Sequence, residues 1–382
     1  MDPDGPQPIL ARPVLLEPGR APKEAPAKMS TAITPSTITS LNSICPDAPW
    51  HLRPPSWTEV LAARNDALVR TPLLESARVN KMLGGRLLMK AEGLQVTGSF
   101  KVRGALNRIA ALTPEERARG IIAFSSGNHA QAVAWAAARF GIRALILMPE
   151  GAPAVKIERT RALGAKVEQH DWRVHRSREL AARIAAERNM VLIPPFEDRR
   201  VLAGAATLGL ELVEQATAMG VASLDAVLTG CSGGGLLAAT AIAVRTLSPT
   251  TELWGVEPVG YEDLAMSLAQ GARVTLPPGP PTICDSLNAR TTGDLTFEIL
   301  RRTLSGAIAV TDADVLQAMR FAFEEFRVVV EPGGAAALAA LLGGNFSLRG
   351  RTAAVVASGA NVDASLAAQA LTGERVPAVA PP

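Results

Sequence analysis

Short, almost uninterrupted apolar runs alternate with helical stretches along most of this chain. Candidate strands lie at 86–90, 120–126, 143–149, 165–170, 190–194, 225–230, 252–258 and 352–358, and most of them are apolar along their length. Strands that are apolar along their whole length are buried on both faces, which is typical of parallel sheets covered by helices. The pattern therefore predicts an α/β fold, and 382 residues favour more than one sheet.

Both ends of the chain differ in composition from this alternating part. Residues 1–50 are rich in Pro, Ala, Ser and Thr without periodicity, which predicts a disordered tail, and Met29 within it is an alternative start. Residues 367–382 are expected to form a second tail. The N-terminus has acidic residues and prolines where a signal peptide needs basic residues and an apolar run, so we expect a cytoplasmic protein.

Composition argues against several classes of protein. No window approaches about 18 uninterrupted apolar residues, so a membrane-spanning helix is not expected. The net charge of +3 is small, the arginines are scattered and there is one tyrosine, which argues against nucleic-acid binding. The cysteines and histidines show neither a disulfide nor a metal-ligand pattern, so reduced thiols are expected.

Three glycine-containing loops follow predicted strands and open helices. They are SSGNHA at 125–130, GCSGGGLLA at 230–238 and SGANVD at 358–363. In open α/β sheets ligands bind at the carboxyl ends of the strands, and glycines let backbone N–H groups converge on an anion at a helix start. The second loop therefore predicts a phosphate-binding cup formed by Ser232, Gly233, Gly234 and Gly235.

A lysine, Lys101, follows Gly-Ser-Phe in the segment TGSFKVRGA, directly before a predicted helix. The glycine loops fit neither the ATP pattern G-x-x-x-x-G-K-[S/T] nor the dinucleotide pattern G-x-G-x-x-G. A phosphate cup and a pocket lysine, without a nucleotide motif, indicate a phosphorylated cofactor that a lysine can hold covalently. Pyridoxal phosphate has this chemistry, and Lys101 is the candidate lysine.

Several segments occur in the order expected for one enzyme family: GSFKVRGA, SSGNHAQA, CSGGGLLA, GVEP, VEPGGAAALAA and SGANVD. From about Trp57 to Asp363 the chain resembles the fold-type-II pyridoxal-phosphate enzymes of the threonine/serine dehydratase, 3-hydroxyaspartate ammonia-lyase and serine racemase group. Cysteine synthases and tryptophan synthase β chains share this fold but have different residues in the lysine and SSGNH segments.

The resemblance implies a tryptophan synthase β-like architecture of two lobes, each with a mostly parallel sheet covered by helices. We expect a large cofactor-binding lobe of residues 51–119 and 198–366 and a small mobile lobe of residues 120–197. We also expect a homodimer or homotetramer.

The resemblance further implies the residues around the cofactor. Lys101 would bind it covalently and then remove the Cα proton of the substrate, with Phe100 packed beside the cofactor ring. Asn128 would hydrogen-bond the phenolic oxygen, and the cup at 232–235 would bind the phosphate, although Ser232 stands where many relatives have a further glycine. Ser358 would face the pyridine nitrogen, and a hydroxyl leaves this nitrogen neutral, which favours elimination over transamination.

A second set of residues would bind the amino-acid substrate. The resemblance implies that the α-carboxylate is bound, largely through backbone N–H groups at a helix start, by Ser125, Ser126, Gly127, Asn128 and His129. In the racemase branch a serine at the position of Ser126 returns a proton to the second face of Cα, whereas many threonine dehydratases have alanine there. A role in carboxylate binding alone is the alternative for Ser126.

Two further sites are implied by the same resemblance. Arg178 matches an arginine that binds the second carboxylate of dicarboxylate ligands in the racemase branch, and a solvated arginine is the alternative. Glu257 and Asp263, with the main-chain oxygen of Tyr261 between them, match the spacing of a divalent-cation site. Hard cations such as Mg²⁺ or Ca²⁺ prefer such oxygen ligands, and a solvated acidic turn is the alternative.

These observations predict an ammonia-lyase (dehydratase) that converts a β-hydroxy amino acid into a 2-oxo acid and ammonia. Threonine or serine is the expected substrate, and 3-hydroxyaspartate is the main contender. An amino-acid racemase is the enzyme alternative, suggested by Ser126. A pyridoxal-phosphate-binding protein without turnover is a further alternative, and the intact Lys101 and Ser358 argue against it. The chain ends soon after SGANVD, so isoleucine feedback through a C-terminal regulatory domain is not expected.

Overall fold

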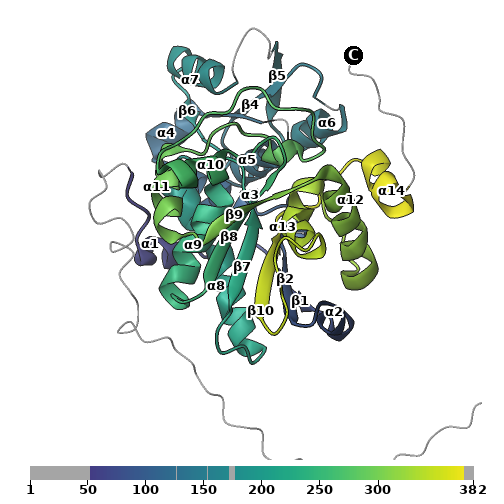
Figure 1. Ribbon diagram of the computed structural model, residues 1–382. Coiled ribbons are helices and arrows are strands. Elements are labelled where there is room, and N and C mark those ends of the chain that lie inside the picture. Colours follow the sequence, from purple (N-terminus) through teal and green to yellow (C-terminus); the bar gives the residue numbers. More distant parts are fainter. Residues whose placement is uncertain (1–51, 126, 153, 172–176, 374–382) are drawn as a thin grey trace, which may run out of the picture. The chain divides into compact units, whose positions relative to one another are not determined.

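The computed structural model describes residues 52–125, 127–152, 154–171 and 177–373 (Figure 1). The predicted tail over residues 1–50 lies outside the described residues, as do Ser126 and the end of the chain from residue 374. Two sheets organise the described part of the chain, one with six strands and one with four.

The larger sheet has the strand order β1-β2-β10-β7-β8-β9. All neighbouring strands pair in parallel except β1, which pairs antiparallel with β2 at one edge. In Figure 1 the strands β7, β10 and β2 lie side by side within this sheet. Its strands are β1 (Leu73–Glu75), β2 (Arg86–Ala91), β7 (Ala226–Gly230), β8 (Glu252–Pro258), β9 (Gly306–Val310) and β10 (Thr352–Ala357).

The smaller sheet has the order β5-β4-β3-β6 and is parallel throughout. Its strands are β3 (Ile121–Phe124), β4 (Ala144–Pro149), β5 (Lys166–His170) and β6 (Val191–Leu192). All four strands come from one continuous part of the sequence, within the residues predicted to form the small lobe. The limits of the two lobes remain a prediction.

Helices connect these strands and cover both sheets. In the first half of the chain they are α1 (Trp57–Ala62), α2 (Ala77–Leu83), α3 (Lys101–Ala110), α4 (Pro114–Arg119), α5 (Asn128–Arg139), α6 (Ala154–Ala162) and α7 (Ser177–Glu187), with the 3₁₀ turn η4 (Glu92–Leu94). In the second half they are α8 (Arg199–Ala218), α9 (Gly235–Leu247), α10 (Asp263–Gln270), α11 (Asp294–Thr303), α12 (Asp312–Phe321), α13 (Pro332–Leu342) and α14 (Ala364–Thr372), with the 3₁₀ turn η5 (Asp285–Leu287) and the π-helical turn η6 (Ala322–Phe326).

Successive residues of each strand face opposite sides of the sheet, and both sides are apolar. In β2, Leu88 belongs to a core cluster with helices α8, α9 and α11, whereas its neighbour Leu87 belongs to a cluster with α12 and α13. In β3, Ile121 packs with α3 and α5, whereas Ile122 packs with α7. This arrangement confirms the predicted α/β fold with parallel sheets covered on both faces.

Helix α3 packs against elements of both sheets. Val102 and Leu106 belong to the apolar cluster of the smaller sheet. On another side of α3, a Cβ added to Gly104 would lie 2.7 Å from the carbonyl oxygen of Val201 in α8. A Cβ added to Gly204 of α8 would lie 2.4 Å from the carbonyl oxygen of Arg103. The two glycines therefore let α3 and α8 cross at close range.

Three elements differ from the sequence prediction. Strand β1 has only three residues, and β9 (GAIAV) consists largely of small residues with weak strand preference, so neither was expected. The assignment of residues 367–372 to a tail was wrong, because helix α14 extends through them. Ala, Leu and Gln favour this helix, and Gly373 ends it with a φ of +73°.

None of the helices in the described residues combines the length and the apolar composition needed to cross a bilayer.

Candidate active site

The predicted cofactor loops meet in one cavity of about 320 Å³. It lies where the parallel strands β3, β7 and β10 end, which is where ligands bind in open α/β sheets. The sequence-predicted residues that line it are Phe100, Lys101, Ser125, Gly127, Asn128, His129, Ser232, Gly233, Gly234, Gly235 and Ser358. Segments separated by more than a hundred residues therefore form one site.

Lys101 is the first residue of α3, and its amine is buried and has a lowered pKa. Its Nζ atom lies 3.2 Å from the carbonyl oxygen of Pro195 and 5.1 Å from the ring centre of Phe100. Burial lowers the pKa of Lys101 to about 8, and the negative charge of Glu331 opposes this shift only in part. A fraction of the amine is thus neutral near pH 7, and a neutral amine can act as a nucleophile or a base.

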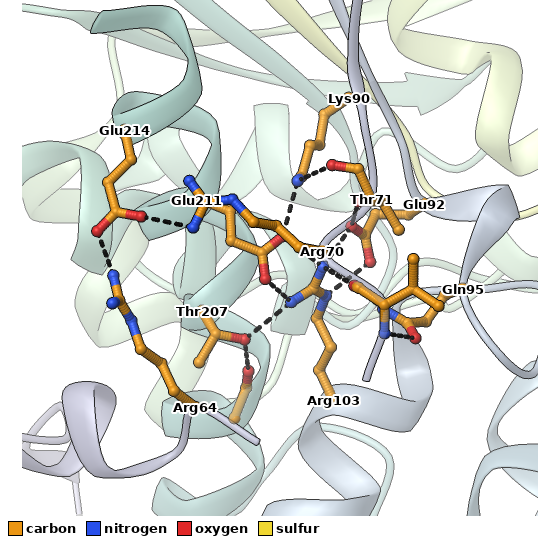
Figure 2. A network of polar contacts seen from close by, with 12 residues as sticks. Arg64, Arg70, Thr71, Lys90, Glu92, Gln95, Arg103, Thr207, Glu211 and Glu214 are labelled. Carbon is orange, nitrogen blue, oxygen red and sulfur yellow. Dashed lines mark hydrogen bonds and ion pairs between the residues drawn. The ribbon is translucent and has the colours of Figure 1, made fainter. Parts of the chain in front are cut away.

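A network of buried charges fixes the start of α3, as Figure 2 shows. The guanidinium group of Arg103 donates to both carboxylate oxygens of Glu92 and to both of Glu211, all four at 2.8 Å. Lys90 donates to Glu211 at 2.7 Å and to the carbonyl oxygen of Thr71 at 2.7 Å. Lys90, Glu92 and Arg103 are almost completely buried. The network therefore ties the helix of the candidate lysine to β2, η4 and α8.

The glycine cup between β7 and α9 has a conformation that side chains would disturb. Gly234 precedes α9 with a φ of +86°, in the left-handed region that favours glycine. A Cβ added to Gly233 would lie 2.2 Å from the ring of Phe196. The carbonyl oxygen of Gly233 accepts hydrogen bonds from the Gly293 amide at 3.2 Å and from Thr296 Oγ1 at 2.7 Å. This loop at the N-terminus of a 13-residue helix suits a phosphate group.

Asn128 opens α5 and is held by two polar side chains that sequence analysis did not single out. Its Nδ2 atom donates to Glu331 Oε1 at 2.6 Å, and its Oδ1 atom accepts from Asn361 Nδ2 at 2.7 Å. Burial and the charge of Asp285 raise the pKa of Glu331 to about 7. Since an amide nitrogen carries two hydrogens, Asn128 keeps one for a ligand in the cavity.

The remaining predicted residues of the cavity lie in the loops after β3 and β10. Ser358 is buried, and its carbonyl oxygen accepts from the Phe100 amide at 3.0 Å, which joins two of the loops. The Gly127 amide donates to Ser125 Oγ at 3.1 Å. His129 Nε2 lies 3.0 Å from the carbonyl oxygen of Ile193, and burial, together with the charge of Lys101, lowers the pKa of His129 to about 3. His129 is therefore neutral near pH 7.

The structure does not bring Arg178 into this cavity. Arg178 is exposed on α7 and lines a separate groove of about 770 Å³ together with Arg108 and Glu197. Its neighbour Ser177 lines the cavity instead, with its hydroxyl 3.0 Å from His170 Nε2. The predicted contact between Arg178 and a substrate carboxylate gains no support from this placement and remains a prediction.

The two predicted cation ligands are buried close to the end of β8. Glu257 accepts from the backbone amides of Leu264 at 2.8 Å and Ala265 at 3.0 Å. Asp263 Oδ2 accepts from Thr292 Oγ1 at 2.7 Å, while its Oδ1 atom is buried without a hydrogen-bond partner. Burial raises the pKa of Glu257 to about 8 and that of Asp263 to about 6.

These two carboxylates fit a cation only in part. The unpartnered Oδ1 atom of Asp263 suits one, but the described residues contain no group of three His, Cys, Asp or Glu side chains that could hold a metal. The predicted third ligand is the main-chain oxygen of Tyr261. The side-chain hydroxyl of Tyr261 donates instead to the carbonyl oxygen of Pro280 at 2.9 Å.

The family described as pyridoxal-phosphate dependent enzyme matches residues 65–359, which include all the residues that line the cavity except Asn361. The chain belongs to this pyridoxal-phosphate-dependent enzyme family. The suspected resemblance is thereby confirmed, and so is the expectation of pyridoxal phosphate as the cofactor of the family.

Three members of this family illustrate the similarity. An L-threo-3-hydroxyaspartate ammonia-lyase from a Pseudomonas species is 40% identical over 80% of this chain and 93% of its own length. A solved threonine deaminase from the organism abbreviated T.th. is 44% identical with a TM-score of 0.74, covering 81% of this chain and 99% of the other. The solved serine racemase of maize is 35% identical with a TM-score of 0.76, covering 82% of this chain and 96% of the other.

The residues of the cavity fit the cofactor of this pyridoxal-phosphate-dependent enzyme family. Lys101 offers an amine with a lowered pKa, the loop at 232–235 offers backbone amides at a helix start, and Asn128 offers an amide hydrogen. The cradle also excludes side chains at Gly233 and Gly234, where a Cβ would collide with Phe196 or with Thr292 and Thr296.

Several polar residues that line this cavity were not predicted from the sequence. Glu331 and Asn361 lie inside the segments VEPGG and SGANVD that carried the resemblance, so a signal for them was present. Lys156 and Asp285 also line it, and no local pattern marks either of them.

Proposed function

We propose that this protein is a pyridoxal-phosphate-dependent ammonia-lyase that converts a β-hydroxy amino acid into a 2-oxo acid and ammonia. Threonine, serine and 3-hydroxyaspartate are the proposed substrates. The observation that supports this most directly is the position of Lys101, whose amine has a pKa of about 8 and faces the same cavity as the glycine cup and Ser358. The relatives named ammonia-lyase or threonine deaminase support the same reaction.

Lys101 has two roles in this proposal. Its amine would hold the cofactor, and in its free, neutral form it would remove the proton from the substrate Cα. Pyridoxal phosphate, when bound, draws electrons from Cα and so makes that proton acidic. The network around Arg103 holds α3, and thereby Lys101, in position for this proton transfer.

The loop after β3 orients the substrate. The α-carboxylate of the substrate binds to Ser125, Gly127 and Asn128 at the start of α5. Ser126, which lies outside the described residues, belongs to the same proposed site. Glu331 accepts from the Asn128 amide at 2.6 Å, and the second amide hydrogen would be available to the phenolic oxygen of the cofactor. His129 belongs to the same proposed carboxylate site and is uncharged there near pH 7, because burial lowers its pKa to about 3.

Ser358 favours elimination over the other reactions of this cofactor. Ser358 lines the cavity, and its hydroxyl would leave the pyridine nitrogen of a bound cofactor neutral, whereas an aspartic acid at this position would protonate it. With a neutral ring, loss of the Cα proton is coupled to departure of the β-hydroxyl group. Ammonia is then released from the resulting enamine by water.

Racemisation is the second candidate activity. It is suggested by Ser126 and by the similarity to a serine racemase, since a serine hydroxyl at this position could return a proton to the second face of Cα. A Ser126→Ala variant separates the two activities, because racemisation requires this hydroxyl and elimination does not.

A panel of amino acids tests the proposed function. The purified holoprotein is incubated with L- and D-threonine, serine, 3-hydroxyaspartate and phenylserine, and ammonia and 2-oxo acid are measured. We expect both products in equal amounts from at least one β-hydroxy amino acid, and none with Lys101→Ala. Wild-type protein that produces neither from any substrate would favour the pyridoxal-phosphate-binding protein without turnover.

Three finer assignments belong to the same proposal. Glu257, the Tyr261 carbonyl oxygen and Asp263 would hold Mg²⁺ or Ca²⁺, with the unpartnered Asp263 Oδ1 atom in support. The cytoplasmic location and the homodimeric or homotetrameric state are proposed from the sequence and the family.

A further inference from the structure

The charged side chains of the cavity restrict which part of the chain can recognise a second substrate carboxylate. Among the described residues, the lysine and arginine side chains that line the cavity are Lys101 and Lys156. The amine of Lys101 is needed for the cofactor and for proton transfer. Arg178 lines the separate groove. Within the described part of the chain, this leaves Lys156 as the cation available to a dicarboxylic substrate.

Lys156 already has a partner that it can exchange. Its Nζ atom lies 2.8 Å from Oδ2 of Asp285, which belongs to η5 on the side of the larger sheet. The Lys156 side chain is only 12% exposed, whereas that of Asp285 is 57% exposed. A lysine removed from water needs an anion beside it, while an aspartate largely in water loses little when it is released.

The position of Lys156 suits a substrate held by its α-carboxylate. The predicted α-carboxylate site follows β3, and Lys156 lies on α6, the helix that follows β4. Strands β3 and β4 are parallel neighbours, so both groups lie at the same edge of the smaller sheet. Glu331, which holds Asn128, is also close enough to interact with the charge of Lys156. The cavity thus presents a cation at the same edge of the smaller sheet as the predicted α-carboxylate site.

We propose that Lys156 recognises the second carboxylate of a dicarboxylic β-hydroxy amino acid, such as 3-hydroxyaspartate, by exchanging Asp285 for the substrate. This inference rests on the proposed function. The lysine keeps an anionic partner throughout, and Asp285 moves into water when the dicarboxylate binds. With threonine or serine, which have no second carboxylate, the pair with Asp285 stays intact. Lys156 and Asp285 would then set the preference between the two substrate classes.

Opposite effects of two substitutions test this proposal in the holoenzyme. Lys156→Met should lower the ratio of kcat/KM for 3-hydroxyaspartate over threonine by about ten- to a hundredfold, the effect of losing one charge-assisted hydrogen bond. Asp285→Asn should raise the same ratio, since the competing carboxylate is gone. Lys166→Met is the matched control, because Lys166 is exposed on β5 and pairs with Glu168 away from the cavity. It should leave the ratio unchanged.

A binding measurement tests the inference without turnover. Succinate and butyrate differ in one carboxylate and do not react. Calorimetry should show a preference for succinate in the wild-type holoenzyme, a smaller preference in Lys156→Met and a larger one in Asp285→Asn. If wild-type protein turns over no β-hydroxy amino acid, the proposed function fails, while the succinate preference still tests Lys156.

Several outcomes would overturn the inference. They are an equal loss for both substrate classes in Lys156→Met, an unchanged ratio, or a preference that depends on Arg178→Met instead. If Lys156→Met does not fold, the double variant Lys156→Met/Asp285→Asn, which removes both charges of the pair, takes its place. The double variant should show the reduced ratio expected for Lys156→Met, and a wild-type ratio would again refute the proposal.

Discussion

At the scale of single residues, the lysines Lys90, Lys101 and Lys156 differ in what their amines contact. Lys90 is bound by Thr71, Glu211 and Gln215, and Lys156 is bound by Asp285. Lys101 has one contact at 3.2 Å with a carbonyl oxygen and a pKa lowered to about 8 by burial. Reactivity should therefore concentrate on Lys101.

Reductive labelling tests this difference. When the holoprotein is treated with borohydride and digested, the mass of the reduced cofactor should appear on the peptide that contains Lys101, since this amine alone among the three is not held by a carboxylate. Lys101→Ala should lose the label. A label on Lys90 or Lys156 in wild-type protein would refute the assignment.

His129 should make stability depend on pH. Its folded-state pKa of about 3 lies below the unfolded value of about 6.5, so below pH 6.5 the unfolded chain binds a proton that the folded protein does not. The free energy of unfolding should fall by up to about 3 kcal/mol from this group between pH 6.5 and 4.5. Urea unfolding of wild-type and His129→Asn protein across this range measures the contribution. Equal slopes for the two proteins would exclude His129 as its source.

At the scale of elements, helix α3 joins two parts of the fold and depends on an ionic network rather than on a capping side chain. Its N-cap residue, Phe100, makes no side-chain capping hydrogen bond, so Arg103 and its partners provide the polar anchor two residues after Lys101 (Figure 2). The segment GSFKVRGA thus contains both the reactive lysine and the residue that positions its helix.

Arg103→Met should destabilise the protein by about 3–5 kcal/mol, because it leaves the buried carboxylates of Glu92 and Glu211 without their main partner. Chemical denaturation measures this loss. Arg320→Met is the matched control, since Arg320 forms an exposed ion pair with Glu324 and its loss should have no measurable effect. If both variants unfold at the same denaturant concentration as wild-type protein, the network does not stabilise α3.

At the scale of the whole molecule, the sequence predicted the segments of the site better than their connections. The glycine loops and Lys101 could be found because each has a local pattern at the end of a strand. The ion pair between Lys156 and Asp285 could not be found, because it joins residues 129 positions apart through the packing of two sheets. Arg178 shows the opposite case. Its sequence position matches an arginine of the racemase branch, but its side chain lines a separate groove and not the cavity.

A cation at Glu257 and Asp263 should stabilise the whole folded protein, because a ligand that binds only the folded state raises the melting temperature. Chelator treatment should lower the Tm, and Mg²⁺ or Ca²⁺ should restore it. Asp263→Asn should remove the response to both treatments, since Asp263 supplies the unpartnered Oδ1 atom. A Tm that is indifferent to chelator and cation in wild-type protein would show that these carboxylates hold no metal.

The double contact of α3 has a consequence for recombining this enzyme with its relatives. A chimera that exchanges only residues 121–192, the smaller sheet with its own helices, would place a foreign surface against Val102 and Leu106 of α3. The same helix would still have to cross α8 through Gly104 and Gly204. Exchange points chosen at the sheet boundary would therefore disturb the helix that begins with Lys101. A chimera that keeps Lys101 in position therefore has to take α3, and the residues that α3 contacts in the smaller sheet and in α8, from the same parent enzyme.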